Sequence, residues 1–372
     1  MVNTKSPFAP AFGSSPPVLA GREELIRTFI DGLEDGPGSS ARFSMYYGPR
    51  GIGKTVLLNS IEESAKREGW IVISETCTPG LTSRLIGNGL PDAYDKVPDS
   101  IVNKRRLTGV NIVNIAGSSW ENEPQRKLGL REWIEKIANT LESHGTGLLI
   151  TLDEINPVNL NEIIELVTVI QLAFRQNLNV AFAGTTLSTF MEELLDGTGI
   201  TFLRRADWNE LNRVSITDAK QAIYDPIINN GRTISKEIAR KAAMYTEGYC
   251  YLIQLVGDLM WKQQPDNETI TEENLVEAIK GAKNRIGRKV LAPELTYLPD
   301  VQRSYLLAMA QEIKENGQAK TSAVVSRIGK DINYGGVYRE RLIQRGLIFA
   351  SGYGLVDFVI PGMGEYILEH TS

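Results

Sequence analysis

The segment GPRGIGKT, residues 48–55, constrains the fold more than any other part of the sequence. It matches the pattern G-x-x-x-x-G-K-[ST] without a gap, and it lies between an expected strand at 42–47 and an expected helix at 54–68. The glycines allow backbone N–H groups to turn inward around phosphate oxygens, and the positive end of the helix dipole points at the same oxygens. A loop of this kind between a strand and a helix predicts a phosphate-binding site on a parallel sheet.

The two polar residues that end this loop have the clearest expected roles. Lys54 supplies a compact cation for the β- and γ-phosphates and is counted with the catalytic residues, and the Thr55 hydroxyl is expected to bind Mg²⁺. The sequence therefore predicts ATP and Mg²⁺ as ligands. The predicted nucleotide-binding residues of the loop are Gly48, Pro49, Arg50, Gly51, Ile52, Gly53, Lys54 and Thr55.

Two carboxylates follow the apolar segment GLLITL, residues 147–152, which we expect to form a neighbouring strand. A carboxylate at the end of that strand can reach a metal near Thr55, so Asp153 is predicted to bind or orient Mg²⁺. Glu154 is predicted to position and polarise the attacking water. The sequence therefore predicts that the chain hydrolyses ATP and does not only bind it. Thr185 ends the next apolar strand and would lie beside the γ-phosphate, although an ordinary strand-ending turn explains it equally well.

The chain of 372 residues is long enough for two or three compact domains. Helices alternate with almost continuous apolar strands up to residue 183, which predicts an α/β domain with a parallel sheet covered on both faces. Residues 79–128 interrupt this pattern and are expected to be irregular, with a candidate hairpin at 109–116, whereas 218–287 shows only helical periodicity. We expect an extended arm at 1–17, the α/β domain at 18–212, a helical domain at 213–290 and a C-terminal domain at 291–372.

Composition argues against several other classes of protein. No run of about 18 apolar residues is present, and the N-terminus lacks the apolar segment of a secretory signal. The two cysteines, Cys77 and Cys250, and the two histidines show no disulfide or metal-binding spacing. We therefore expect a cytoplasmic protein with no membrane partner. The net charge of −5 argues against general coating of nucleic acid and still leaves room for a local basic patch.

Three further segments give the chain a resemblance to a known family. They are LAGRE at 19–23, TFLRRA at 201–206 and TEGYCYLIQ at 246–254. Together with the phosphate loop and the acidic pair, they resemble the AAA+ ATPases of bacteria and archaea that are related to origin-recognition proteins. The resemblance implies a three-layer P-loop AAA+ parallel sheet, followed by an all-α lid and a winged-helix domain.

The same resemblance implies roles for individual residues. Val18 and Gly21 would lie on the adenine side of the nucleotide. Arg205 would be an arginine finger that reaches the γ-phosphate of a neighbouring subunit, which implies a homo-oligomer. A surface arginine at a strand edge is the alternative for Arg205. Cys250 stands where the family usually has proline, and no arginine follows at the usual sensor-2 position.

The C-terminal part of the sequence bears on the partner. Residues 333–345, NYGGVYRERLIQR, are expected to form the recognition helix of the winged helix. Arg341 and Arg345 are four apart, so they share one face of that helix and are predicted to contact double-stranded DNA. Lys283 and Arg288 belong to a basic run before the domain, which either contacts phosphates or is a solvated linker.

Two functions are therefore compatible with the sequence. The first is a DNA-associated ATPase in which the ATP state controls how the winged helix engages DNA. The second is an ATP-driven signalling or defence switch whose winged helix binds a protein partner and not DNA. The arginines of 333–345 favour the first function, and the near-neutral balance of 8 Lys/Arg against 9 Asp/Glu in residues 293–372 favours the second.

Overall fold

A computed structural model describes residues 5–10, 20–97, 128–196, 202–264 and 267–370. The chain divides into two compact units. The sheet unit comprises Arg22–Gly48 and Lys54–Glu210, and the helical unit comprises Met1–Gly21, Pro49–Gly53 and Leu211–Ser372. The candidate hairpin at 109–116 and the candidate residue Val18 lie outside the described residues.

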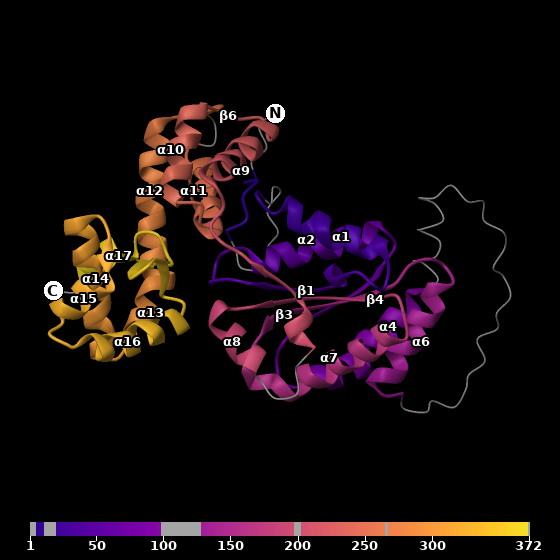
Figure 1. Cartoon of the computed structure of the whole chain (residues 1–372). Coiled ribbons are helices and arrows are strands. Elements are labelled where there is room, and N and C mark those ends of the chain that lie inside the picture. The colour runs from indigo at the N-terminus through magenta and orange to yellow at the C-terminus, as the bar shows by residue number, and fades with distance from the viewer. Residues whose placement is uncertain (1–4, 11–19, 98–127, 197–201, 265–266, 371–372) are drawn as a thin grey trace. The chain divides into compact units, whose positions relative to one another are not determined.

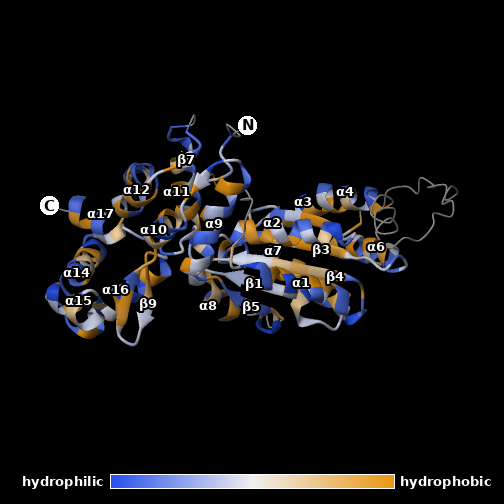
Figure 2. Ribbon diagram, turned by 90° about the horizontal axis from the view of Figure 1, so that it is seen from above, coloured by the Kyte–Doolittle hydropathy of each residue, from blue (hydrophilic) through white to orange (hydrophobic). Residues whose placement is uncertain are grey.

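The core of the sheet unit is a parallel sheet. Its five strands are β1 (Phe43–Tyr47), β2 (Ile71–Thr76), β3 (Leu148–Ile155), β4 (Val180–Thr186) and β5 (Asp207–Glu210). They are ordered β2-β3-β4-β1-β5, and every neighbouring pair is parallel (Figure 1). Figure 2 shows hydrophobic colour along β3 and β4, and β4 is buried at every residue, as strands covered on both faces are.

Helices cover both faces of this sheet. On one face α1 (Glu23–Asp35) packs against α2 (Lys54–Arg67), and on the other α6 (Leu130–Glu142) packs against α7 (Leu160–Arg175) (Figure 1). A further helix, α8 (Ser188–Asp196), follows β4. The three-layer P-loop fold expected from the sequence is therefore confirmed.

One helix of this unit has the length and composition of a membrane span. The segment is Pro157–Arg175, which contains α7. Side chains of α7 such as Ile163, Leu166 and Ile170 are buried in the core cluster of the sheet unit. These residues form the face of α7 that packs into the core, and 28% of the apolar window of the segment is buried.

The expectation of an irregular segment at 79–128 was wrong for residues 81–95. These residues are helical and contain a π turn, whose hydrogen bonds join residues five apart where those of an α-helix join residues four apart. Leu85 and Leu90 are therefore five residues apart and are both buried in the core. That spacing breaks the 3.6-residue period, so the pattern in the sequence hides the helix. The elements are α3 (Leu81–Arg84), the π turn (Leu85–Gly89) and α4 (Leu90–Asp95).

The first part of the helical unit contains four main helices. They are α9 (Ile216–Asn229), α10 (Lys236–Thr246), α11 (Cys250–Lys262) and α12 (Glu272–Ile286), followed by a π turn (Gly287–Leu291) and α13 (Ala292–Thr296). The expectation of helices alone was wrong in one detail. Two short strands, β6 (Thr233–Ile234) and β7 (Thr269–Ile270), form a parallel pair. Each has only two residues, which is too short for a period-2 pattern to be recognised.

The last part of the helical unit combines helices with a small antiparallel sheet. Its three strands are ordered β8-β10-β9, and both neighbouring pairs are antiparallel. In chain order the elements are α14 (Asp300–Asn316), β8 (Ala319–Lys320), α15 (Thr321–Arg327), α16 (Ile332–Gln344), β9 (Ile348–Gly352), β10 (Leu355–Phe358) and α17 (Met363–His370).

Candidate nucleotide-binding site

An irregularity in β3 sets the direction of the two acidic side chains. Leu152 pairs with Gly184 and Ile155 pairs with Thr186, so two residues of β3, Asp153 and Glu154, face the single residue Thr185 of β4. This two-against-one count is a β-bulge, which turns side chains that a regular strand would place on opposite faces. Glu154 has a φ of +56°, an uncommon conformation for a residue other than glycine and one that is often found at functional sites.

The carboxylate of Asp153 is the centre of a hydrogen-bond network at this bulge. Its Oδ2 accepts a bond of 2.7 Å from the Thr55 hydroxyl, and its Oδ1 accepts from the Thr185 hydroxyl and, at 3.0 Å, from the Glu154 N–H. The Glu154 N–H also donates to Thr185 Oγ1 at 3.1 Å. The structure thus brings together Thr55, Asp153 and Thr185 and leaves the side chain of Glu154 exposed beside them.

The positions of Lys54 and Thr55 follow from the start of α2. They are its first two residues, so the positive end of the helix dipole lies beside them. The Lys54 ammonium donates to the Gly48 carbonyl at 2.8 Å. Because β1 and β3 are parallel strands of one sheet, the loop after β1 and the carboxylates at the end of β3 lie at the same edge, which is where ligands bind in open α/β sheets.

The oxygen atoms at this edge fit Mg²⁺. A hydroxyl and a carboxylate are the hard ligands that Mg²⁺ prefers, and the ion usually keeps several waters and takes substrate phosphates as further ligands. Over the part of the chain that the structure describes, no group of three or more His, Cys, Asp and Glu residues could hold a metal ion. A metal site made by protein side chains alone is thus not found among those residues. Thr55 and Asp153 could hold Mg²⁺ together with nucleotide phosphates.

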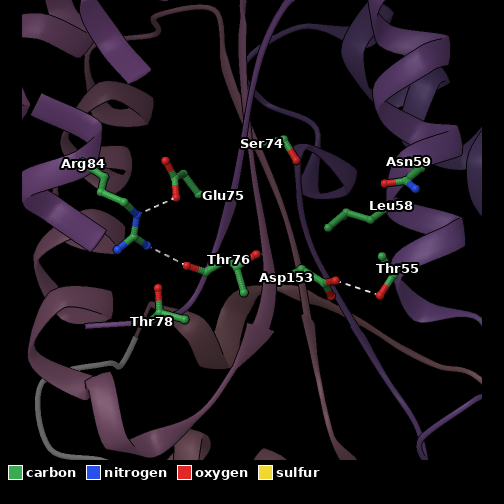
Figure 3. Close-up of a pocket in the computed structure, with 9 residues that line it drawn as sticks. All are labelled: Thr55, Leu58, Asn59, Ser74, Glu75, Thr76, Thr78, Arg84 and Asp153. Atoms are coloured by element: carbon green, nitrogen blue, oxygen red, sulfur yellow. Dashed lines mark hydrogen bonds and ion pairs between the residues drawn. The ribbon is translucent and has the colours of Figure 1, made fainter. Parts of the chain in front are cut away.

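A pocket of about 370 Å³ opens beside the Thr55–Asp153 pair, between α2 and the end of β2 (Figure 3). Arg84 of α3 closes its far side. The guanidinium forms an ion pair with Glu75 at 3.0 Å and donates to the carbonyls of Thr76 and Pro79. Sequence reasoning missed these residues, and the only signal was the polar ending SET of the β2 segment.

The central residues of the phosphate loop, Pro49–Gly53, belong to the helical unit. The Tyr249 hydroxyl donates to the Arg50 carbonyl at 2.9 Å, and the Tyr251 N–H donates to the Gly51 carbonyl at 3.2 Å. Burial raises the pKa of Tyr249, so its hydroxyl stays protonated and can donate. Gly51 has a φ of +73°, and a Cβ there would lie 2.2 Å from the Tyr249 hydroxyl, so only glycine fits.

Two residues taken from the family resemblance are placed as follows. Arg205 ends a 3₁₀ turn, Leu203–Arg205, in the sheet unit, and its side chain is exposed. Gly21 belongs to the helical unit, has a φ of +69°, and faces Asp218 and Val214, with the Asp218 carboxylate 3.1 Å from where a Cβ would be.

The four candidate DNA contacts lie in the helical unit, two at the end of α12 and in the π turn after it, and two at α16. Arg341 and Arg345 are exposed, and the Arg341 guanidinium lies 5.4 Å from the ring centre of Tyr338. Arg288 is exposed in the π turn after α12. Lys283 forms an ion pair of 2.5 Å with Glu365, so its charge is partly neutralised within the chain.

Comparison with solved structures places this arrangement in a known fold. A Walker-type ATPase of Pyrococcus abyssi superposes with a TM-score of 0.62 at 14% identity, over 94% of this chain and 96% of that one. The ORC2 protein of Aeropyrum pernix in its ADPNP–ADP complexes gives 0.56 at 14% identity, over 97% of this chain and 95% of that one. The ADP form of ORC2 gives 0.53 at 15% identity, over 98% of both chains. The chain therefore has the P-loop AAA+ fold, as expected, and resembles these proteins in fold.

Sequence comparison adds one match. A family model described as a domain of unknown function (DUF8462) matches residues 288–367, which is the region from the second π turn to α17. A search of curated proteins finds no match.

Proposed function

We propose that the chain binds Mg·ATP and hydrolyses it, and that the cycle drives a conformational switch. The observation that carries this proposal is the Asp153 carboxylate, which accepts hydrogen bonds from the Thr55 and Thr185 hydroxyls beside the phosphate loop. A carboxylate at the end of a strand and a hydroxyl at the start of a helix are the two parts that P-loop NTPases use to hold Mg²⁺.

In this proposal each group has a separate task. The backbone N–H groups of the phosphate loop and the Lys54 ammonium bind phosphate oxygens. Thr55 and Asp153 hold Mg²⁺, which when bound neutralises charge on the phosphates. Glu154, at the exposed end of the bulge, positions the attacking water and accepts its proton. Thr185 fixes both Asp153 and the Glu154 backbone, so it orients the two carboxylates.

The direct test is nucleotide binding by a Lys54→Ala variant. Titration with ATP in the presence of Mg²⁺ should show binding by the wild type and none by the variant. Lys66→Ala is the matched control, because Lys66 lies in the last turn of the same helix and is exposed. A folded Lys54→Ala protein with unchanged ATP affinity contradicts the proposal.

We further propose that residues 300–360 form a winged helix and that its partner is double-stranded DNA. The order α14-β8-α15-α16-β9-β10 supports the winged helix, with α16 as recognition helix. Exposed Arg341 and Arg345 on α16 and exposed Arg288 support a DNA contact, and Lys283 contributes less because of its pair with Glu365. We also propose that the chain has three domains, 18–212, 213–290 and 291–372, and that the protein is located in the cytoplasm.

A gel-shift titration with the full chain, with and without ATP, tests the DNA contact. The double variant Arg341→Ala, Arg345→Ala should lose binding, and Arg240→Ala, Lys241→Ala removes the same charge from α10 and should keep it. Binding should weaken steeply with salt, because contacts to phosphates release counterions.

A protein partner is the second candidate. Apolar side chains are exposed on α16 and β9, with Ile332 at 58%, Val337 at 48% and Phe349 at 37% exposure, and such surfaces mark protein contacts. If no DNA binds at low salt with or without ATP, this candidate replaces DNA.

A further inference from the structure

The turn between α10 and α11 is held rigidly against the residues that precede α9. The Val214 N–H donates to the Gly248 carbonyl at 3.0 Å. Gly248 has a φ of +74°, and a Cβ there would lie 1.9 Å from the Val214 carbonyl oxygen. Only glycine lets the turn approach Val214 this closely, so the turn packs directly on the residues that precede α9.

The same turn contacts the phosphate loop through Tyr249. Its hydroxyl bonds the Arg50 carbonyl and fills the space where a side chain of Gly51 would be. Tyr249 is 3% exposed, so no water layer separates the ring from the loop. A change in the backbone of Arg50 and Gly51, which phosphate binding acts on directly, is passed to this ring because the two are in van der Waals contact.

Arg213 connects this turn with the C-terminal hairpin. Its Nη1 forms an ion pair with Glu247, the residue with a φ of +48° that ends α10. Its Nη2 donates to the carbonyls of Phe358 and Val359, at 2.8 and 2.9 Å, and the guanidinium lies 5.8 Å from the ring centre of Phe349. One side chain thus holds the turn that contacts the phosphate loop and the end of β10.

We propose that Tyr249 and Arg213 form a relay that couples the phosphate loop to the β9–β10 hairpin. The relay rests on the proposed nucleotide binding. It explains how that binding acts on the β9–β10 hairpin. Every link lies within the helical unit. Both are positioning residues, since each acts through the loop backbone or the hairpin.

A second connection runs in parallel and is weaker. Arg50 forms an ion pair of 3.0 Å with Glu294 of α13, with side-chain exposures of 74% and 34%. Exposed ion pairs contribute little and are screened by salt. Arg213 is less exposed, at 24%, and its two bonds to the hairpin carbonyls do not depend on a partner charge, whereas its ion pair with Glu247, which is 53% exposed, should weaken at high salt.

Hydrogen exchange of the hairpin amides, 348–358, tests the relay. The full chain is compared with and without Mg·ADPNP. In the wild type, nucleotide should change exchange in the hairpin by about fivefold or more, the lower end of typical coupling between two sites. In Arg213→Gln the difference between the two states should disappear while ADPNP still binds. Arg240→Gln removes an exposed arginine of α10 that pairs with Glu237 one turn earlier in the same helix, and should respond as the wild type does.

Two more variants separate coupling from loss of structure. Glu247→Ala removes the side-chain link between Arg213 and the turn and keeps the bonds to the hairpin, so hairpin exchange without nucleotide should stay as in the wild type while the response to nucleotide falls. Tyr249→Phe keeps the ring and removes one hydrogen bond to the loop, so it should reduce the response and weaken ADPNP binding about three- to tenfold.

The outcomes are distinct. A wild-type response in Arg213→Gln or Glu247→Ala overturns the relay, as does a wild type that binds ADPNP and shows no change in the hairpin. Faster hairpin exchange in Arg213→Gln with the nucleotide response intact also overturns it, because the arginine would then be structural only. A wild type that does not bind ADPNP refutes the proposed function itself.

Discussion

Replacing Thr185 by valine tests the part of the site that fixes the two carboxylates. The side chains have nearly the same shape, so the change removes a hydroxyl and leaves no cavity. Thr185 is fully buried, and its hydroxyl donates to the Asp153 carboxylate and accepts from the Glu154 N–H. A hydrogen bond to a charged group contributes about 1.5–3 kcal/mol to stability. The Glu154 N–H keeps a second acceptor in Asp153 Oδ1, so the loss of its bond to Thr185 adds little to the cost of the substitution.

The expected cost of Thr185→Val is therefore about 2 kcal/mol in the free energy of unfolding. Asp153 would be free to rotate away from Thr55, and misplacement by about 1 Å lowers a catalytic rate by as much as about 100-fold. We expect turnover of ATP to fall about 10- to 100-fold. Urea unfolding gives the first quantity, and release of phosphate at saturating ATP gives the second.

Thr186→Val is the matched control in the same strand. Thr186 is also fully buried, and its hydroxyl donates to the neutral Ile155 carbonyl at 2.8 Å. This variant should lose about 1 kcal/mol of stability and keep the wild-type rate. Equal turnover in the two variants would refute the view that Thr185 orients the acidic pair.

Three further predictions follow from the site. If Arg205 is a finger that acts in a neighbouring subunit, specific ATPase activity rises with protein concentration and Arg205→Ala removes the rise; concentration-independent activity in both proteins counts against it. Gly51→Ala places a Cβ on the Tyr249 hydroxyl and should weaken ATP binding at least about tenfold. Gly80→Ala is the control: Gly80 is also at positive φ, no atom lies nearer than 3.8 Å to where its Cβ would be, and ATP binding should not weaken. Burial raises the pKa of Tyr46, and that of Tyr245 to about 12, so the folded chain keeps these protons after the unfolded chain releases them near pH 10. The free energy of unfolding should fall as the pH rises above about 10, and Tyr46→Phe should reduce that fall in urea titrations at pH 9 and 11.

Several features of the fold could be predicted because their signals are local. The apolar strand before residues 48–55 and the helix after them needed only periodicity and the glycine spacing. Asp153 and Glu154 were placed at the end of a strand by the same reasoning. The structure places Asp153 against Thr55, at 2.7 Å, and against Thr185.

The bulge and the π turn could not be predicted, for a physical reason. A bulge depends on the pairing of β3 with β4, and no local pattern distinguishes Glu154 at positive φ from an ordinary strand residue. The π turn at 85–89 interrupts the 3.6-residue spacing of apolar residues by which a helix is recognised in a sequence. Arg213 belongs to the same class, because its partners Phe358 and Val359 lie far along the chain.

The central claim is that Glu154 handles the attacking water, and Glu154→Gln tests it most directly. The variant keeps the size of the side chain and removes its capacity to accept a proton. The measurement is ATP affinity together with the rate of a single turnover in the presence of Mg²⁺. We predict ATP affinity close to that of the wild type and a rate lower by about 100-fold or more, the contribution of a general base. A variant that binds ATP and hydrolyses it at the wild-type rate would contradict the account.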